Sequence, residues 1–330
     1  MAFTVLALSG GGYLGLHEVV ILRELERSLN KPLSDAFDLI CGTSVGAMAA
    51  VAAAAGIPAA RMEVAFREHG PQIFHGHRLR RYPLFHSISN INALFHSRYR
   101  SIAIRNTMQD ILGSEPRLRD LRTRVIIPAI NLERGGLKVF KTSHLTGQTQ
   151  DSAVSVIDAV VAATAAPIYF PVARLGQNHF VDAGIFANSP DVLALHEVFH
   201  FIGLPIADIF VVSIGTSAIL NKWDFHGRTA RGALFWLNEG RLFNTISAVQ
   251  RDMSTSVLRN MLGSRYLRID SVRDSRHERH LKFDHPSPEA TNLLTQLAEH
   301  TWQEAESRMR PTLQMLREHT VNRDWRNNVN

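Results

Sequence analysis

The first two thirds of the chain alternate short apolar runs with longer stretches in which apolar residues recur every three or four positions. The run "FTVLAL" predicts a strand, and the helical stretch after it places Val19, Leu22 and Leu25 on one side. Further strands are expected at "FDLICG", "RVIIPAI", "LKVFKT", "HFVDAG" and "DIFVVSIG". The turn "ERGG" joins two of these strands directly, whereas helical stretches separate most of the others.

Four further helices are expected between these strands. They are an alanine-rich helix from Val45, one starting near Pro58, "SAVSVIDAVVAATAA" ending at Pro167, and "SPDVLALHEVFHF" with Ser189 as N-cap. Alternating strands and helices predict an α/β fold with a parallel or mixed sheet that is covered on both faces.

The pattern changes near residue 218, where helical segments begin to follow one another. Helices are expected at about 229–262 and 287–319, with a short strand "RYLRID" between them. We therefore expect a single domain with an α/β core over 1–217 and a helical C-terminal part over 218–330 packed on it.

The stretch 61–105 differs from its surroundings in charge. It holds eight arginines and five histidines but only two acidic residues, Glu63 and Glu68. Much of it reads as a loop-rich insertion or lid. It is either a solvated basic loop or a surface that meets phosphate groups.

Composition changes the picture only slightly. A net charge of +6 favours anionic partners. The single cysteine, Cys41, excludes an internal disulfide and favours the cytoplasm. The first residues lack a basic segment, so they predict a strand and not a signal peptide. The apolar run from Val45 falls short of the roughly 20 residues that a membrane span needs, so only surface attachment to a membrane is considered.

A candidate nucleophile lies between the second strand and the alanine-rich helix. Gly42-Thr43-Ser44-Val45-Gly46 fits G-x-S-x-G, and its strand-to-helix context is the one a nucleophile elbow requires. The helix that follows would direct its positive end at Ser44. A second Gly-Thr-Ser ends in Ser217 but lacks the later glycine, so we interpret it as a loop or capping serine.

A serine nucleophile needs a base, and no histidine has a local context that marks it as the partner. Asp182 lies at a strand end before a turn of small residues, where it could accept the proton of the serine directly. An ordinary turn or capping aspartate is the alternative for this position.

Three consecutive glycines follow the first strand. Gly10, Gly12 and Gly15 fit G-x-G-x-x-G, which suits a dinucleotide, but Asp38 lies at the beginning of the second strand and not at its end. A P-loop is excluded because Leu16 stands where lysine is needed. We favour an oxyanion hole in which the N–H groups of Gly11 and Gly12 stabilise a tetrahedral intermediate. This requires the first two strands to be neighbours.

The segment "HEVFH" matches the zinc motif H-E-x-x-H through His196 and His200. No third ligand emerges from the sequence, so we interpret both as histidines on a partly exposed helix and expect no metal.

Four segments together resemble the patatin-like phospholipases: "LSGGGYLGL", "CGTSVGA", "ATAAPIYFP" and "VDAGIFANSP". The resemblance runs from about Thr4 to Gly215. It implies a three-layer α/β/α fold with a mostly parallel sheet, and a dyad of Ser44 and Asp182 without histidine. It further implies an oxyanion turn at Gly10, Gly11 and Gly12, and a segment from Ala165 to Pro167 that lines the site. The glycines of the elbow and turn motifs are then Gly15, Gly42, Gly46 and Gly184.

Two positions depart from the pattern of that family. Leu14 stands where the family usually has arginine or lysine, and Ala183 replaces the glycine that usually follows the aspartate. Neither change removes a chemical group that the mechanism uses.

A narrower resemblance is carried by "GYLGL", "IIPAINLERGGLKVFKTSH" and "FDHPSPEA". These segments are similar to the bacterial phospholipase effectors of cyclic-oligonucleotide anti-phage signalling. That resemblance implies a cyclic dinucleotide activator and the cell membrane as the substrate surface.

The sequence therefore predicts a cytoplasmic lipid acyl hydrolase that acts peripherally at the inner membrane through an acyl-serine intermediate. No cofactor and no nucleic acid polymer are expected, and homo-oligomerisation stays open. The alternatives are a nucleotide-binding module and a protein that docks on membranes without hydrolysing lipid.

Overall fold

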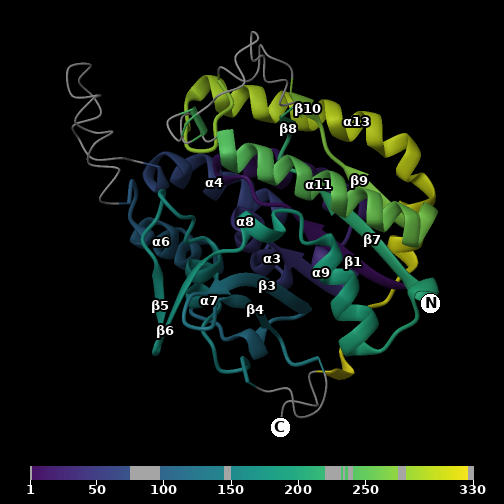
Figure 1. Cartoon of the computed structure of the whole chain (residues 1–330). Coiled ribbons are helices and arrows are strands. Elements are labelled where there is room, and N and C mark those ends of the chain that lie inside the picture. Colours follow the sequence, from purple (N-terminus) through teal and green to yellow (C-terminus); the bar gives the residue numbers. More distant parts are fainter. Residues whose placement is uncertain are drawn as a thin grey trace.

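The structure is a computed structural model that describes residues 2–74, 97–144, 150–219, 232, 235–236, 241–273 and 280–325 (Figure 1). Its centre is an eight-stranded sheet in the order β5-β6-β3-β2-β1-β7-β9, with β4 paired to β3. The strands are β1 (Phe3–Leu8), β2 (Leu39–Gly42), β3 (Arg124–Asn131), β4 (Gly136–Lys141), β5 (Ala173–Leu175), β6 (Asn178–Asp182), β7 (Ile209–Ile214) and β9 (Tyr266–Ile269). A separate pair joins β8 (Ala218–Ile219) to β10 (Val272–Arg273).

The sheet is mixed, with a parallel centre. β1 runs parallel to β2 and β7, and the β2–β3 and β7–β9 pairs are also parallel. β4, β5 and β6 form the antiparallel end of the sheet. The carboxyl ends of β1 and β2 therefore lie side by side, as the proposed oxyanion turn requires.

Helices over 15–29, 45–54, 59–73, 156–163 and 191–196 lie where the hydrophobic pattern predicts, whereas those over 33–36, 101–112 and 184–187 were not expected from it. The helices are α1 (Gly15–Leu29), α2 (Leu33–Ala36), α3 (Val45–Ala54), α4 (Ala59–Ile73), α6 (Ser101–Leu112), α7 (Val156–Ala163), α8 (Gly184–Ala187), α9 (Asp191–His196), α11 (Arg241–Leu262) and α13 (Pro288–Glu318). Short 3-10 helices are η1 (Gly12–Leu14), η4 (Leu118–Asp120), η6 (Ile206–Asp208) and η8 (Gly263–Arg265). A short π-helix, η5 (Glu197–Ile202), continues α9.

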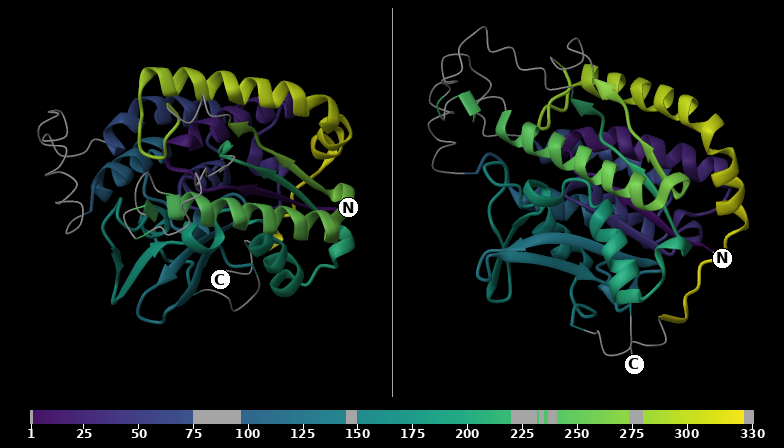
Figure 2. Two further views of the ribbon diagram at one scale, coloured as in Figure 1. Left: turned by 45° about the horizontal axis from the view of Figure 1, so that its top comes forward. Right: turned by 45° about the vertical axis from the view of Figure 1, so that its right-hand side comes forward.

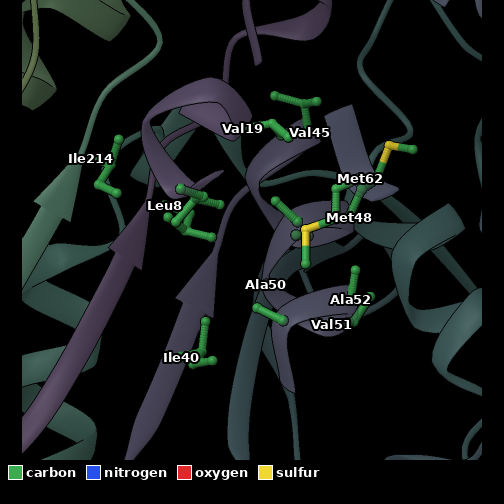
Figure 3. Close-up of a cluster of buried hydrophobic side chains, with 14 of the residues drawn as sticks. Leu8, Val19, Ile40, Val45, Met48, Ala50, Val51, Ala52, Met62 and Ile214 are labelled. Carbon is green, nitrogen blue, oxygen red and sulfur yellow. The ribbon is translucent and has the colours of Figure 1, made fainter. Parts of the chain in front are cut away.

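Alternating residues of the strands bury two separate hydrophobic clusters, one on each face of the sheet. Leu6 and Leu8 of β1 pack with side chains from α1, α3, α4, α7 and α13. Val5 and Ala7 of the same strand pack with side chains of α9 and α11. Figure 3 shows part of the first cluster, where Leu8 faces the side chains of α3. Helices on both faces make this a three-layer α/β/α fold, which confirms the predicted fold class.

The C-terminal helices contribute to both outer layers. α13 packs along α1 and buries apolar side chains that include Leu294, Trp302 and Leu313. α11 buries Leu258 and Leu262 on the opposite face. In the left view of Figure 2, the strands β7 and β9 run between these two helices. Burial of both helices against the sheet core ties the C-terminal part to the rest of the domain.

Some predicted boundaries are wrong. Ser189 is not the N-cap of α9, because Pro190 holds that position and the Ser189 hydroxyl meets the Ser9 hydroxyl at 3.3 Å. The helix expected in "SAVSVIDAVVAATAA" ends at Ala163 and not at Pro167. Of the helix expected at 229–262, the described continuous part is α11, which begins at Arg241.

The basic stretch 61–105 is only partly described, since 75–96 lie outside the described residues. Its ends are helical, in α4 and α6. Three of the described arginines there have acidic partners: Arg67 pairs with Glu63 at 2.7 Å, Arg98 pairs with Asp284 at 3.4 Å, and Arg105 pairs with Asp158. These three arginines therefore make ion pairs within the fold. Whether 75–96 meet phosphate groups stays a prediction.

In the part of the chain that the structure describes, every helix is too short or too polar to cross a lipid bilayer.

Candidate active site

Ser44 occupies a strained turn between β2 and α3. Its φ of 55° and ψ of −123° lie in a region that residues other than glycine rarely adopt. Strain of this kind costs on the order of 1–3 kcal/mol and persists only where the surroundings impose it. The side chain is nearly buried, and the residue lies directly before the N-terminus of α3. This is the geometry expected of a nucleophile elbow.

Close packing explains the glycines around this turn. A Cβ at Gly42 would overlap the carbonyl of Gly46, and one at Gly46 would lie 2.5 Å from the carbonyl oxygen of Leu8. A Cβ at Gly15 would lie 2.6 Å from a methyl group of Val45. The three glycines therefore let β1, β2 and the starts of α1 and α3 come together, which agrees with their predicted place in the elbow and turn motifs.

Asp182 is the last residue of β6 and is 3% exposed. Burial raises the pKa of its carboxyl to about 6, against the lowering effect of hydrogen bonds from the Ser44 side chain and the Gly184 N–H. The Gly184 N–H donates to Oδ1 at 2.7 Å. Two residues 138 positions apart thus face each other, Ser44 and Asp182.

The glycine turn lies next to Ser44. A Cβ at Gly10 would lie 3.2 Å from the Cβ of Ser44 and would overlap the side chain of Asn188. The Gly10 N–H donates to the Asn188 carbonyl at 2.8 Å. Gly10 therefore shapes the turn but has no N–H free for a ligand, which narrows the expected oxyanion donors to Gly11 and Gly12.

Hydrogen bonds fix the direction of those two N–H groups. The Gly10 carbonyl accepts from the Thr216 hydroxyl at 2.8 Å, and the Gly11 carbonyl accepts from the Leu14 N–H at 3.2 Å. In a trans peptide the next N–H points away from the carbonyl, so the Gly11 and Gly12 N–H groups face away from these donors. Among the described residues, neither N–H has an acceptor.

An apolar pocket opens beside these groups. It encloses about 490 Å³ including its open mouth, and both Ser44 and Gly12 line it. The rest of the lining is mainly apolar: Tyr13, Val45, Met48, Phe66, Gly70, Ile73, Phe74, Ile104, Thr107, Thr164, Phe170 and Phe283. A pocket of this composition suits a hydrocarbon chain better than a charged ligand.

Phe283 is a site residue that the sequence motifs did not single out. Its carbonyl accepts the Tyr13 N–H at 2.8 Å, and its ring lines the pocket beside Gly12. The adjacent Asp284 accepts a hydrogen bond from the Tyr99 hydroxyl at 2.8 Å. In the sequence, only the segment "FDHPSPEA" pointed to this region. Its contact with the glycine turn has no local signal, because about 270 residues separate the two along the chain.

A buried polar network supports the start of the glycine turn and also has no signal in the sequence. Arg268 of β9 donates to the hydroxyls of Ser9 at 3.0 Å and Ser213 at 2.7 Å, and pairs with Asp270 at 2.7 Å. The N–H of Ser9 donates to the Glu18 carboxyl at 2.8 Å. No local motif marks such a network, because its members come from different strands and helices.

The "HEVFH" segment makes internal contacts. Glu197 is buried and accepts hydrogen bonds from Lys141 at 2.9 Å and from His144 at 2.8 Å. The rings of His196 and His200 stack on each other. In the described part of the chain, no group of three histidine, cysteine, aspartate or glutamate side chains could hold a metal ion.

The structure argues against the dinucleotide interpretation and agrees with the interpretation of Ser217. Asp38 accepts hydrogen bonds from the N–H and hydroxyl of Thr4 and pairs with His319 at 2.8 Å, so it lies at the opposite end of β1 from the glycine turn. It could not hold the ribose of a dinucleotide at that turn. Ser217 follows β7, and its N–H donates to Asp270, as expected for a loop serine.

The departures from the family pattern are also explained. Ala183 has a φ of −73°, a conformation open to any residue, so glycine is not required there. Leu14 is buried in the main hydrophobic cluster. The expected lining segment lies beside the base, because the Ala165 carbonyl accepts the Asp182 N–H at 3.1 Å.

The three-layer α/β/α fold, the strained serine and the apolar pocket together define a serine hydrolase. The family model "Patatin-like phospholipase" matches residues 6–195. The chain belongs to the patatin-like phospholipase family, as the sequence motifs predicted.

Two relatives of similar sequence agree with this assignment. A "cGAMP-activated phospholipase" of Pseudomonas aeruginosa is 35% identical over 92% of this chain and 89% of that protein. One of Vibrio cholerae with the same name is 31% identical over 77% of this chain and 76% of that protein. VipD from Legionella pneumophila is a distant structural neighbour, with a TM-score of 0.46 and 13% identity over 92% of this chain and 67% of VipD.

Proposed function

We propose that the protein hydrolyses the acyl ester bonds of phospholipids through a dyad of Ser44 and Asp182. The observation that carries the proposal is the contact between a serine on a strained elbow and a buried carboxylate whose pKa is about 6, at the edge of an apolar pocket. A carboxylate of that pKa is ionised at neutral pH, yet it is a stronger base than an exposed aspartate. No metal or organic cofactor enters this scheme.

In the first half of the reaction, Asp182 takes the hydroxyl proton as the Ser44 oxygen attacks the ester carbonyl carbon. The carbonyl oxygen becomes an oxyanion, which the N–H groups of Gly11 and Gly12 stabilise. A single donor of this kind contributes about 3–4 kcal/mol to lowering the barrier. The N-terminus of α3 adds a favourable dipole at Ser44.

The second half returns the enzyme to its starting state. The tetrahedral intermediate collapses, and Asp182 gives its proton to the leaving lysophospholipid oxygen. The acyl group then remains on Ser44 as an ester. A water molecule, whose proton Asp182 accepts, attacks this ester. As the second tetrahedral intermediate collapses, Asp182 returns that proton to the Ser44 oxygen and the fatty acid is released. The apolar pocket would hold the acyl chain throughout both steps.

The membrane is the proposed substrate surface. Exposed apolar side chains lie close to the proposed base, with Phe186 of α8 at 58%, Val249 at 64% and Met253 at 57% exposure. α8 begins at Gly184, two residues after Asp182, and packs against α11, which carries Val249 and Met253. These side chains support peripheral contact with a lipid surface.

The names of the relatives support a cyclic dinucleotide as the activator. We propose that cGAMP or a similar cyclic dinucleotide raises the phospholipase activity of this chain. A role in antiviral defence follows only from the resemblance noted in the sequence and stays a prediction.

A fluorophosphonate probe and a phospholipase assay test the proposal together. The probe should label the wild-type protein but not Ser44→Ala. Ser217→Ala is the matched control, because Ser217 also follows Gly-Thr and also has a positive φ. Release of fatty acid from vesicles should increase with a cyclic dinucleotide and be absent in Ser44→Ala. Equal labelling of Ser44→Ala and wild type would remove Ser44 from the role.

A further inference from the structure

One side chain of the C-terminal part holds the segment between the proposed base and the glycine turn. Gln250, on α11, accepts a hydrogen bond from the Asn188 N–H at 2.9 Å. Its amide nitrogen donates to the Ile185 carbonyl at 2.7 Å. Both partners are main-chain groups, so this two-point contact constrains the backbone itself.

The segment needs such support because α8 has only four residues. Its own hydrogen bonds run from the N–H groups of Phe186 and Ala187 to the Ala183 carbonyl. The last carbonyls of a helix have no partner within it, and a helix of one turn is not stable alone. Gln250 satisfies the Ile185 carbonyl and the first N–H after the helix.

The same segment connects the groups proposed to carry out the reaction. Asp182 precedes it, and the Ala187 carbonyl accepts the Thr43 hydroxyl at 2.7 Å, one residue before Ser44. At its end, the Asn188 carbonyl accepts the Gly10 N–H, while the Asn188 amide donates to the Gly10 carbonyl at 3.3 Å. A shift of this segment would therefore move the base and the glycine turn relative to Ser44.

We propose that Gln250 is a positioning residue for ester hydrolysis, because its amide fixes the backbone of 183–188 and with it the spacing of base, nucleophile and glycine turn. The inference rests on the proposed function. Gln250 lies outside the 6–195 that match the family model, so the C-terminal part completes the site. A displacement of about 1 Å at such a site can cost about 100-fold in rate.

Two variants test the inference, with Gln314→Ala as the matched control. Gln314 lies on α13, and its side chain donates to Glu318 at 3.1 Å near the surface. Active sites are counted by fluorophosphonate titration, so that loss of folded protein does not count as loss of rate. Per active site, Gln250→Ala should lower kcat about 10- to 100-fold with KM within about threefold, and Gln314→Ala should change neither.

Gln250→Met keeps the length and packing of the side chain but removes both the acceptor for the Asn188 N–H and the donor to the Ile185 carbonyl. If the two hydrogen bonds position the segment, kcat per active site should fall about as far as in Gln250→Ala, with KM again within about threefold. A role in packing alone would leave Gln250→Met close to the wild type.

Two results would overturn the inference: a kcat per active site within about threefold of wild type in Gln250→Ala, or the same result in Gln250→Met. If Gln250→Ala does not fold, Gln250→Met decides. Failure of the proposed function is recognised separately, because Ser44→Ala would then remain active.

Discussion

Replacing the proposed base by its neutral amide should make the protein more stable while making it inactive. Asp182→Asn keeps the shape of the side chain, and its carbonyl oxygen can still accept the Gly184 N–H. What it removes is a charge that is 3% exposed. In the described structure, the groups that lower the pKa of this carboxyl are Ser44 and Gly184, and neither carries a charge.

The magnitude follows from the pKa of Asp182. Burial raises the pKa from 3.8 to about 6, so the folded protein binds this proton more tightly than the unfolded chain does. The protonated carboxyl therefore contributes its full stabilisation to the folded state below about pH 4, and this contribution is lost as the pH rises through about 6. At 1.36 kcal/mol for each unit, the ionised carboxylate costs the folded state about 3 kcal/mol at neutral pH. The Asp182→Asn variant, which has no charge at this position, would avoid that cost.

Urea unfolding between about pH 4 and pH 7.5, followed by tryptophan fluorescence, measures the effect. The stability of Asp182→Asn relative to wild type should rise by about 2.4 kcal/mol across this range, because part of the ~3 kcal/mol is already lost at pH 4, whatever offset the two proteins have at low pH. Hydrolysis should fall by about 10²- to 10⁴-fold, the usual contribution of a general base. Asp252→Asn, at a side chain that is 77% exposed, is the control and should shift stability by less than about 0.5 kcal/mol.

A stability difference that does not change with pH would refute the reasoning, because it would mean that the buried carboxyl has an ordinary pKa. Near-normal turnover by Asp182→Asn would remove Asp182 as the base and point to a histidine.

Four other outcomes are expected. In the wild type, kcat/KM should rise about tenfold per pH unit below about pH 6 and level off above it, and a flat profile would contradict Asp182 as base. Gly12→Ala should lower kcat at least about 100-fold, because φ is +58° and the new Cβ would lie 2.5 Å from the Phe283 carbonyl oxygen; normal turnover by this variant would exclude Gly12 from the oxyanion turn. Glu18→Gln should keep stability at neutral pH within about 1 kcal/mol, since burial raises the pKa of Glu18 well above its usual range, whereas a large loss in urea unfolding would mean that its charge is needed. Changing Val249 and Met253 together to serine should reduce the fraction bound to vesicles in a sedimentation assay but leave hydrolysis of a short soluble ester unchanged; unaltered vesicle binding would exclude α11 as the contact surface.

The sequence by itself determined the order and type of most elements. The period of the apolar residues located strands and helices because each element must turn its apolar side toward a core, and "FTVLAL", "FDLICG" and the helix from Val45 all lie where expected. G-x-S-x-G identified Ser44 because only small residues fit at the flanking positions of so tight a turn. The N-cap of α9 was predicted one residue too early, because Ser189 is a residue type that favours this position whereas Pro190 occupies it.

Tertiary structure alone decided which residues meet. From the sequence alone, an ordinary turn aspartate was an equally good interpretation of Asp182. The β3–β6 pairing places this residue opposite Ala129, within reach of Ser44. Its pKa depends on burial by the whole fold, which no local pattern contains. Phe283 contacts the glycine turn, and Gln250 donates a hydrogen bond to α8. In both cases the two partners are far apart in the sequence. A sequence records local preferences, whereas the distances and burial on which this chemistry depends arise only when the sheet and both helix layers have assembled.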